Sequence, residues 1–372
     1  MRVVRVLVVA AAVALTACTS PAPVTSTPTA PRVEANPSGV TLDGTPWWPA
    51  GLNAYQLATD WSVNIGCGAM VDLDSFFASL PPHSLTRFNA FDSLATNRVT
   101  GEYDFGPIDR VFQAAERHGQ LVLPVLSAWD GACADEVFKT RDWYADGWRA
   151  PRRANGSAAA ERGFTPTTSY EQWVRIAVDR WKDSPALAMW ETIGEPEPLL
   201  SRDGPCAPDG HQVLRRFVDD VGEIIRDIDP RHLITVGTIG GGQCGTAGPE
   251  YRRLAESPYL DVLQYHDYGA DGVPLPGDAY NGLAVRLRQA QEVGKPLVVT
   301  EIGQHAGDSP GCASAAQRVD DVTRKIDGQR RAGTAGALLW AFVPDPREAE
   351  CTFDIGPDDP VRELLARQNR LG

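Results

Sequence analysis

Two short apolar segments of the sequence each end in a glutamate that is followed within a few residues by glycine or proline. The first is Met189–Pro196, which contains Glu191 and Glu195, and the second is Val298–Gly303, which contains Glu301. Apolar runs bounded by turn residues predict buried strands. Carboxylates at the ends of two such strands, where a buried interior opens into a cleft, are the minimum equipment for a general acid and a nucleophile acting on a glycosidic bond.

Glu195 is the candidate general acid and base because it lies just beyond the first predicted strand, between Gly194 and Pro196. Glu191 is its nearby rival, but a residue inside the strand is expected to pair within the structure. Glu197 is expected to face solvent. The alternative for Glu195 is a solvated loop carboxylate without chemistry.

Glu301 is the candidate nucleophile, and it follows the apolar run Leu297–Val299. A buried carboxylate is costly unless it is compensated. Arg87 and Tyr268 are the expected partners that would keep Glu301 ionised by charge and hydrogen bond. The alternative is a structural salt bridge at the mouth of a barrel.

His266 and Tyr268 are two residues apart at the end of another predicted strand, so extended geometry would point them the same way. A satisfied structural histidine is the alternative reading of His266. Aromatic side chains form the rest of the candidate site, because an exposed ring can stack on the apolar face of a sugar. The candidates, with Trp340 preferred and Trp129 second, are Tyr55, Trp129, Trp143, Trp148 and Trp340.

The order of short apolar runs and amphipathic segments predicts an α/β fold, a single (β/α)8 TIM barrel. The predicted strands are Trp48–Asn53, Leu85–Asn89, Leu121–Ser127, Leu187–Glu191, Leu233–Gly237, Val262–His266, Leu297–Glu301 and Ala337–Phe342. The predicted helices include Pro107–His118, Tyr170–Lys182, His211–Asp227, Gly282–Val293 and Ala315–Ala332. An open doubly wound sheet is the weaker alternative, since no Gly-x-Gly-x-x-Gly follows the first strand. Barrel sites lie at the carboxyl ends of the strands, where polar and aromatic side chains, Asn53 among them, converge.

The first 17 residues read as an export signal, with Arg2 and Arg5 before the apolar run Val6–Leu15. The following Leu-Thr-Ala-Cys resembles a bacterial lipobox, which predicts lipidation of Cys18. An ordinary secretory signal is the alternative. Residues 18–36 are rich in Pro, Thr and Ser, a composition that predicts a linker. Residues 37–372 are expected to form the catalytic domain. The expected location is the outer side of the cell membrane, or the medium.

Six cysteines remain after Cys18, and an even number in an exported chain predicts disulfides. Pairing of neighbours along the chain gives the three expected bonds, Cys67–Cys133, Cys206–Cys244 and Cys312–Cys351. The spacing does not suit a zinc site, and we expect neither a metal nor a cofactor. Without Arg2 and Arg5 the chain has 33 basic and 48 acidic residues, which argues against nucleic acid as a partner. A monomer is expected.

From about Gly39 to Phe342 the chain resembles glycoside hydrolase family 5, in its β-mannanase-like and cellulase-like branches. The resemblance is carried by five segments in the same order as in the family: Val40–Trp47 with Gly51–Tyr55, Leu126–Gly131, Ser184–Glu191, Glu301 and Trp340. It implies a retaining, endo-acting hydrolase of β-linked polysaccharides. The roles it implies for single residues fall on Arg87, Glu195, His266, Tyr268, Glu301 and Trp340.

One position departs from the family pattern. The family has Asn immediately before its acid/base, whereas this chain has Gly194. That Asn would bind the sugar 2-hydroxyl in the transition state, so the departure weakens a mannan assignment more than it weakens the role of Glu195. The alternatives are a carbohydrate-binding lipoprotein on a degenerate barrel and, third, a two-lobed solute-binding lipoprotein.

Overall fold

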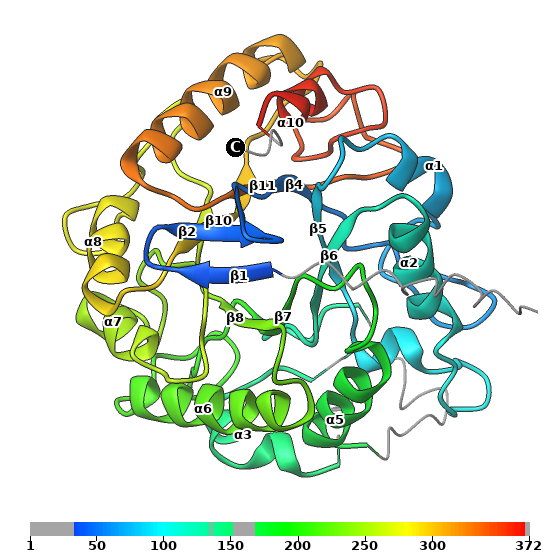
Figure 1. Cartoon of the computed structure of the whole chain (residues 1–372), viewed down its shortest axis with the longest axis vertical. Coiled ribbons are helices and arrows are strands. Elements are labelled where there is room, and N and C mark those ends of the chain that lie inside the picture. The colour runs from blue at the N-terminus through cyan, green and yellow to red at the C-terminus, as the bar shows by residue number, and fades with distance from the viewer. Residues whose placement is uncertain (1–32, 134, 136, 152–167, 369–372) are drawn as a thin grey trace, which may run out of the picture.

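Eight parallel strands hydrogen-bond in the order β8-β7-β6-β5-β4-β11-β10-β9, and a bridge between Thr235 and Val262 joins the two ends of this sheet. Helices surround the ring of strands (Figure 1). The computed structural model describes residues 33–133, 135, 137–151 and 168–368. The predicted (β/α)8 barrel is confirmed, and a two-lobed architecture is excluded.

Each barrel strand overlaps one predicted segment. The strands are β4 (Ala50–Asn53), β5 (Leu85–Asn89), β6 (Leu121–Val125), β7 (Met189–Gly194), β8 (Leu233–Gly237), β9 (Leu263–Asp267), β10 (Leu297–Gly303) and β11 (Ala337–Trp340). Nearly every residue in them is buried. Parallel strands covered on both faces require continuous apolar sequence, which is why the apolar runs located them.

The helices pack on the outside of the barrel. They are α1 (Leu73–Ala78), α2 (Gly106–Arg117), α3 (Arg141–Ala145), α5 (Tyr170–Trp181), α6 (Gly210–Ile228), α7 (Pro249–Ala255), α8 (Leu283–Val293), α9 (Ala315–Ala332) and α10 (Glu363–Gln368), with short 3-10 turns η1 (Asp92–Ala95), η2 (Gly147–Arg149) and η3 (Pro360–Arg362). Ser169 and Gln172 form a capping box at the start of α5. Gly294 ends α8 with a φ of 70°, a conformation that favours glycine.

A small antiparallel sheet closes the amino-terminal end of the barrel. It consists of β1 (Val33–Asn36), β2 (Gly39–Leu42) and β3 (Thr45–Trp47), and Figure 1 shows β1 and β2 lying across the ring of strands. Apolar side chains of this sheet pack on the first residues of the barrel strands. Val33 is buried in this sheet although it lies inside the predicted linker.

All three expected disulfides are present: Cys67–Cys133, Cys206–Cys244 and Cys312–Cys351. Each joins two segments that follow barrel strands, those after β4 and β6, after β7 and β8, and after β10 and β11. The bonds thus constrain the segments at the carboxyl ends of the strands, where the site is expected. Such cross-links stabilise a fold chiefly by restricting the unfolded chain.

The export signal, Cys18 and most of the predicted linker lie outside the described residues. Within the described part of the chain, no helix combines the length and apolar character needed to cross a membrane.

Candidate active site

Glu195 and Glu301 lie at the carboxyl ends of β7 and β10 and line one cavity of about 610 Å³. The backbone of Glu195 adopts a φ of 50°, which is unusual for a residue with a side chain. Hydrogen bonds from the Gly194 amide to Ser127 (2.8 Å) and from the Glu195 amide to Gly237 (2.7 Å) hold this conformation. Strained backbone that the surroundings fix in this way is typical of functional positions.

Glu301 is buried and accepts hydrogen bonds from two side chains. Arg87 Nη1 donates to Glu301 Oε1 at 2.6 Å, and the hydroxyl of Tyr268 donates to Oε2. Burial raises the pKa of Glu301 above its ordinary value, although the charges of His266 and Arg87 and the Tyr268 hydrogen bond act in the opposite direction. Both expected partners are therefore present, but burial outweighs their effect on the pKa.

Arg87 is itself held by Glu191. Its Nε and Nη2 donate to the two carboxylate oxygens of Glu191, each at 2.7 Å. Burial acts to lower the pKa of Arg87, but the charges of Glu191 and Glu301 have the larger effect and raise the pKa above its ordinary value. The guanidinium therefore stays charged. Glu191 also accepts from Gln264 Nε2 at 2.9 Å. The expectation that Glu191 pairs within the structure is confirmed.

His266 connects the two candidate catalytic carboxylates. Its Nδ1 lies 2.7 Å from Glu195 Oε1 and 3.5 Å from Glu301 Oε2. Burial acts to lower the pKa of His266, but the two glutamates raise it above its ordinary value. Burial acts to raise the pKa of Glu195, but the hydrogen bond and charge of His266 lower it. A proton shared by this pair therefore resides on His266 in the free site.

An oxygen of Glu195, an oxygen of Glu301 and a ring nitrogen of His266 all lie within 4.8 Å of one another. Groups of these types at this spacing can also bind a metal ion. Here, however, the Arg87 guanidinium lies 2.6 Å from Glu301 and its positive charge would repel a divalent cation. The arrangement suits proton transfer and nucleophilic attack better.

Aromatic side chains form the walls of the cavity. Tyr55 and Trp340 stack with their ring centres 5.6 Å apart and an interplanar angle of 17°. Trp129 lines the same cavity and packs edge-on against Phe138. These three predicted positions thus lie where a sugar could contact them.

Gly194 also lines the cavity. A Cβ at this position would lie 3.3 Å from Arg87 Nη2 and 3.6 Å from Val125 Cγ1, so a side chain there would crowd the guanidinium. The glycine thus opens the cavity beside the Arg87 guanidinium.

Four expectations are corrected. Asn53 lies beneath the cavity, buried, where it accepts from Arg87 and donates to the backbone of β10 and β11, so it supports Arg87 instead of facing a substrate. Trp148 is fully buried and Trp143 packs against Tyr144, Tyr170 and Phe217. These two indoles are core residues. Glu197 is half-buried and accepts from the Cys244 amide, so it does not simply face solvent.

Phe353 and the Cys67–Cys133 disulfide line the cavity, and neither was placed in the site from the sequence. Asn89, which ends the predicted strand Leu85–Asn89, also lines the cavity, and its Nδ2 lies 3.3 Å from the Cys133 sulfur. Gln264 could have been found, because it precedes His266 and Tyr268 at intervals of two along one strand and therefore shares their face. Phe353 lies in a segment without regular structure, so no periodicity marks it.

The sequence of the chain matches the model of one protein family. The family model described as cellulase (glycosyl hydrolase family 5) matches residues 136–342, more than half of the chain. A probable mannan endo-1,4-β-mannosidase F of Aspergillus flavus is 24% identical over 340 residues, covering 81% of this chain and 64% of the relative. A mannan endo-1,4-β-mannosidase F of Aspergillus clavatus is 28% identical over 227 residues, covering 56% and 47%.

Among solved structures, the endo-1,4-β-mannanase of Rhizomucor miehei aligns with a TM-score of 0.62 and 19% identity, covering 91% of this chain and 98% of that one. This likeness concerns the fold. The chain spans about half to two thirds of the length of the two Aspergillus relatives. On the match to its family model, the chain belongs to glycosyl hydrolase family 5.

Proposed function

We propose that the protein is a retaining glycoside hydrolase that cleaves a β-linked polysaccharide with Glu301 as nucleophile and Glu195 as acid and base. The single observation that carries the proposal is the spacing of these carboxylates, with an oxygen of each within 4.8 Å of the other in one cavity. Retaining enzymes keep the two carboxyl groups about 5–5.5 Å apart, whereas inverting enzymes separate them by about 6.5–9.5 Å.

In the first step Glu301 attacks the anomeric carbon while Glu195 protonates the leaving oxygen, which gives a glycosyl-enzyme. In the second step Glu195 takes a proton from water, and this water releases the sugar from Glu301. Arg87 and Tyr268 hold Glu301 by hydrogen bonds. They orient its oxygens and offset the cost of a buried charge.

His266 supplies the proton that Glu195 needs for the first step. The 2.7 Å hydrogen bond from His266 Nδ1 to Glu195 Oε1 gives the proton a direct route. A bound sugar expels water from the cavity and raises the pKa of Glu195. The proton then moves to the carboxylate and leaves a neutral imidazole with its hydrogen on Nε2.

A mannan is the first candidate substrate, because the relatives named above are mannan endo-1,4-β-mannosidases. The low identity and the partial coverage of those relatives leave β-glucans and other envelope glycans as further candidates. Gly194 argues for a 2-hydroxyl that is bound differently or carries a substituent, since the glycine provides no hydrogen-bonding side chain at this point of the cavity.

The test compares wild type with Glu195→Gln and Glu301→Gln by release of reducing ends from mannans, β-glucans and envelope glycans. Each variant should lose at least about 10³-fold in turnover. Glu292→Gln on α8, away from the cavity, is the matched control and should retain wild-type turnover. Near-wild-type rates in both site variants would refute the proposal.

A carbohydrate-binding protein on a degenerate hydrolase barrel is the second candidate, and Gly194 is the observation that favours it. Such a protein would bind oligosaccharides in calorimetry without turning over even an activated aryl glycoside.

We further propose that the chain is exported and anchored through a lipid on Cys18. Three disulfides support export, because they persist in oxidising compartments. Mass spectrometry of the mature amino-terminal peptide tests this. A diacylated Cys18 is expected, and an unmodified amino terminus would show an ordinary secreted protein instead.

A further inference from the structure

Two further cavities lie next to the cavity around the glutamates, beyond Trp340. A second cavity of about 300 Å³ shares Tyr55, Trp340 and Phe353 with it. A third cavity of about 460 Å³ shares Arg347, Thr352 and Asp354 with the second. The three cavities therefore have common walls and follow one another outward from Glu301, over the segment 343–360 that comes after β11.

Two pairs of stacked rings line the second cavity. Trp340 stacks with Tyr55, and His305 stacks with Phe353 at a centroid distance of 3.8 Å and an interplanar angle of 21°. Phe353 also packs edge-on against Tyr268, whose hydroxyl donates to Glu301. Aromatic walls with a few convergent polar groups are typical of small-molecule sites, and 300 Å³ lies at the lower end of their size range.

One ion pair supplies the charged groups of the second cavity, which Tyr55, His305 and Thr352 also line. Arg347 donates through Nε and Nη2 to the two carboxylate oxygens of Asp354, each at 2.9 Å. The Asp354 side chain is only 10% exposed, whereas that of Arg347 is 60% exposed. Arg347 Nη1 also lies 3.5 Å from Glu350 Oε2, so the guanidinium keeps its place, and its exposed N–H groups suit sugar hydroxyls.

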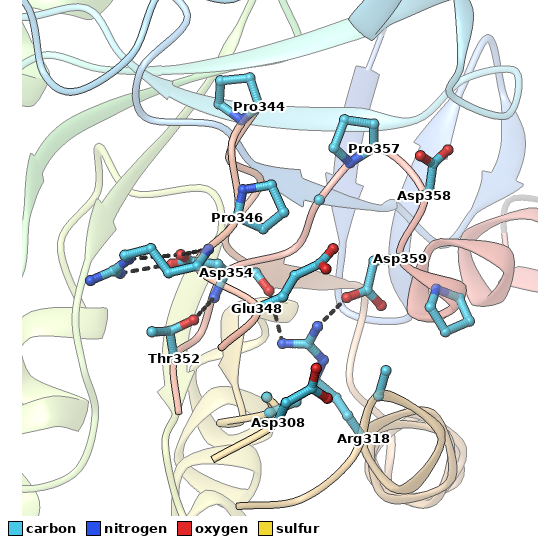
Figure 2. A pocket seen from close by; sticks show the side chains of 16 residues that line it. Asp308, Arg318, Pro344, Pro346, Glu348, Thr352, Asp354, Pro357, Asp358 and Asp359 are labelled. Carbon is cyan, nitrogen blue, oxygen red and sulfur yellow. Dashed lines mark hydrogen bonds and ion pairs between the residues drawn. The ribbon is translucent and has the colours of Figure 1, made fainter. Parts of the chain in front are cut away.

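The third cavity has an excess of negative charge. Five carboxylates and two guanidinium groups line it. Figure 2 shows Arg318 hydrogen-bonded to Asp359 and to the backbone at Asp354, with Glu348 and Asp308 nearby. The positive charge of Arg318 is thus already neutralised, and the remaining acidic side chains would repel an anionic ligand and accept a neutral or basic one.

We propose that the second and third cavities form a distal binding subsite for a neutral or amino-bearing sugar residue of the glycan chain, and that this subsite disfavours uronate residues. The proposal rests on the proposed function. It assigns His305, Phe353 and Arg347 to recognition of a sugar that is not at the scissile bond. It follows that the distal subsite raises kcat/KM for long substrates and does not affect kcat/KM for short ones.

The test measures kcat/KM for neutral oligosaccharides of increasing length and for a short aryl glycoside. The variants Arg347→Ala and His305→Ala should lower kcat/KM for long chains about tenfold or more, through KM, and should leave the aryl glycoside unchanged. His305→Ala leaves the Arg347–Asp354 ion pair intact, so its result can still be interpreted if Arg347→Ala destabilises the segment 343–360. Arg331→Ala on α9, which lines none of the three cavities, is the control.

A second experiment tests the charge. The triple variant Asp308→Asn, Glu348→Gln, Asp358→Asn should raise kcat/KM for a uronate-bearing chain several-fold and leave a neutral chain unchanged. The inference is overturned if kcat/KM of both single variants depends on chain length as it does in wild type. It is also overturned if the triple variant changes kcat/KM equally for the uronate-bearing and the neutral chain. If wild type turns over no glycan, the proposed function fails instead. In that case calorimetry measures the affinity of wild type and Arg347→Ala for the neutral oligosaccharides. Equal affinities of the two proteins would overturn the inference.

Discussion

Glu191 and Glu301, on strands β7 and β10, accept hydrogen bonds from a single guanidinium, that of Arg87. All three side chains are nearly inaccessible to solvent. The two negative charges and one positive charge leave the group with one net negative charge, and this charge resides beside the anomeric carbon in the proposed mechanism. Glu191 thus fixes the donor that orients the nucleophile without facing the cavity itself.

Replacement of Glu191 by Gln should destabilise the fold. The amide would turn an N–H group toward Arg87 and leave part of the buried guanidinium without an acceptor. Loss of one partner from a buried pair costs about 3–5 kcal/mol. Urea unfolding measures this change, and kcat should fall as well because Arg87 loses its fixed position. Glu292→Gln serves as the control, and an unchanged free energy of unfolding in Glu191→Gln would contradict this role.

Gly303 is required for the position of Tyr268. A Cβ at Gly303 would lie 2.2 Å from Tyr268 Cε1, so Gly303→Ala should push the ring away from Glu301. We expect kcat to fall about 10²–10³-fold, as for loss of a preorganised donor. Tyr268→Phe, which keeps the ring and removes only the hydroxyl, should give a loss of similar size. Wild-type kcat in Gly303→Ala would show that Tyr268 does not orient the nucleophile.

Removal of His266 should narrow the pH range of activity. His266 lowers the pKa of Glu195 and acts to lower that of Glu301. In His266→Gln the pKa of Glu301 should rise, which moves the acidic limb of kcat/KM toward neutral pH. The alkaline limb of kcat/KM should move to lower pH, because the proton is no longer kept on an imidazole whose pKa is raised. Equal profiles for variant and wild type would contradict the proton route, and the thermal midpoint of both proteins checks folding.

Acid should destabilise the fold through Asp229. Burial acts to raise the pKa of this carboxyl, but hydrogen bonds from His232 and Trp190 lower it from 3.8 to about 2. The lowered pKa contributes about 2 kcal/mol that is fully present above pH 3.8 and is lost as the pH falls toward 2. Asp229→Asn should reduce the free energy of unfolding at pH 6 and flatten its slope between pH 4 and 2. The exposed neighbour Asp227→Asn is the control, and an unaltered slope in Asp229→Asn would refute the assignment.

Much of the fold could be predicted because burial on both faces imposes continuous apolar sequence on the barrel strands. Leu85–Asn89 and Leu233–Gly237 coincide with β5 and β8. The contacts among Arg87, Tyr268, His266 and the two glutamates follow from their places at strand ends, which a closed barrel brings to one rim.

What could not be predicted depends on the direction of single side chains. Asn53 ends β4 and pairs in register with Arg87 of β5, yet its amide turns down to the backbone of β10 and β11. Trp148 lies in a long polar segment, but its indole is buried against Phe217. The lowered pKa of Glu195 and the raised pKa of Glu301 arise from His266 and from burial, which composition and spacing do not reveal.

The most direct test of the double-displacement mechanism is to trap the glycosyl-enzyme. Wild-type protein is incubated with activated 2-deoxy-2-fluoro mannosides and glucosides, and intact mass followed by peptide mapping locates the bound sugar. We expect one added glycosyl group, attached to Glu301, and no label in Glu301→Gln. A label on another residue, or an unlabelled protein that still hydrolyses its polysaccharide, would contradict the assignment of Glu301 as nucleophile.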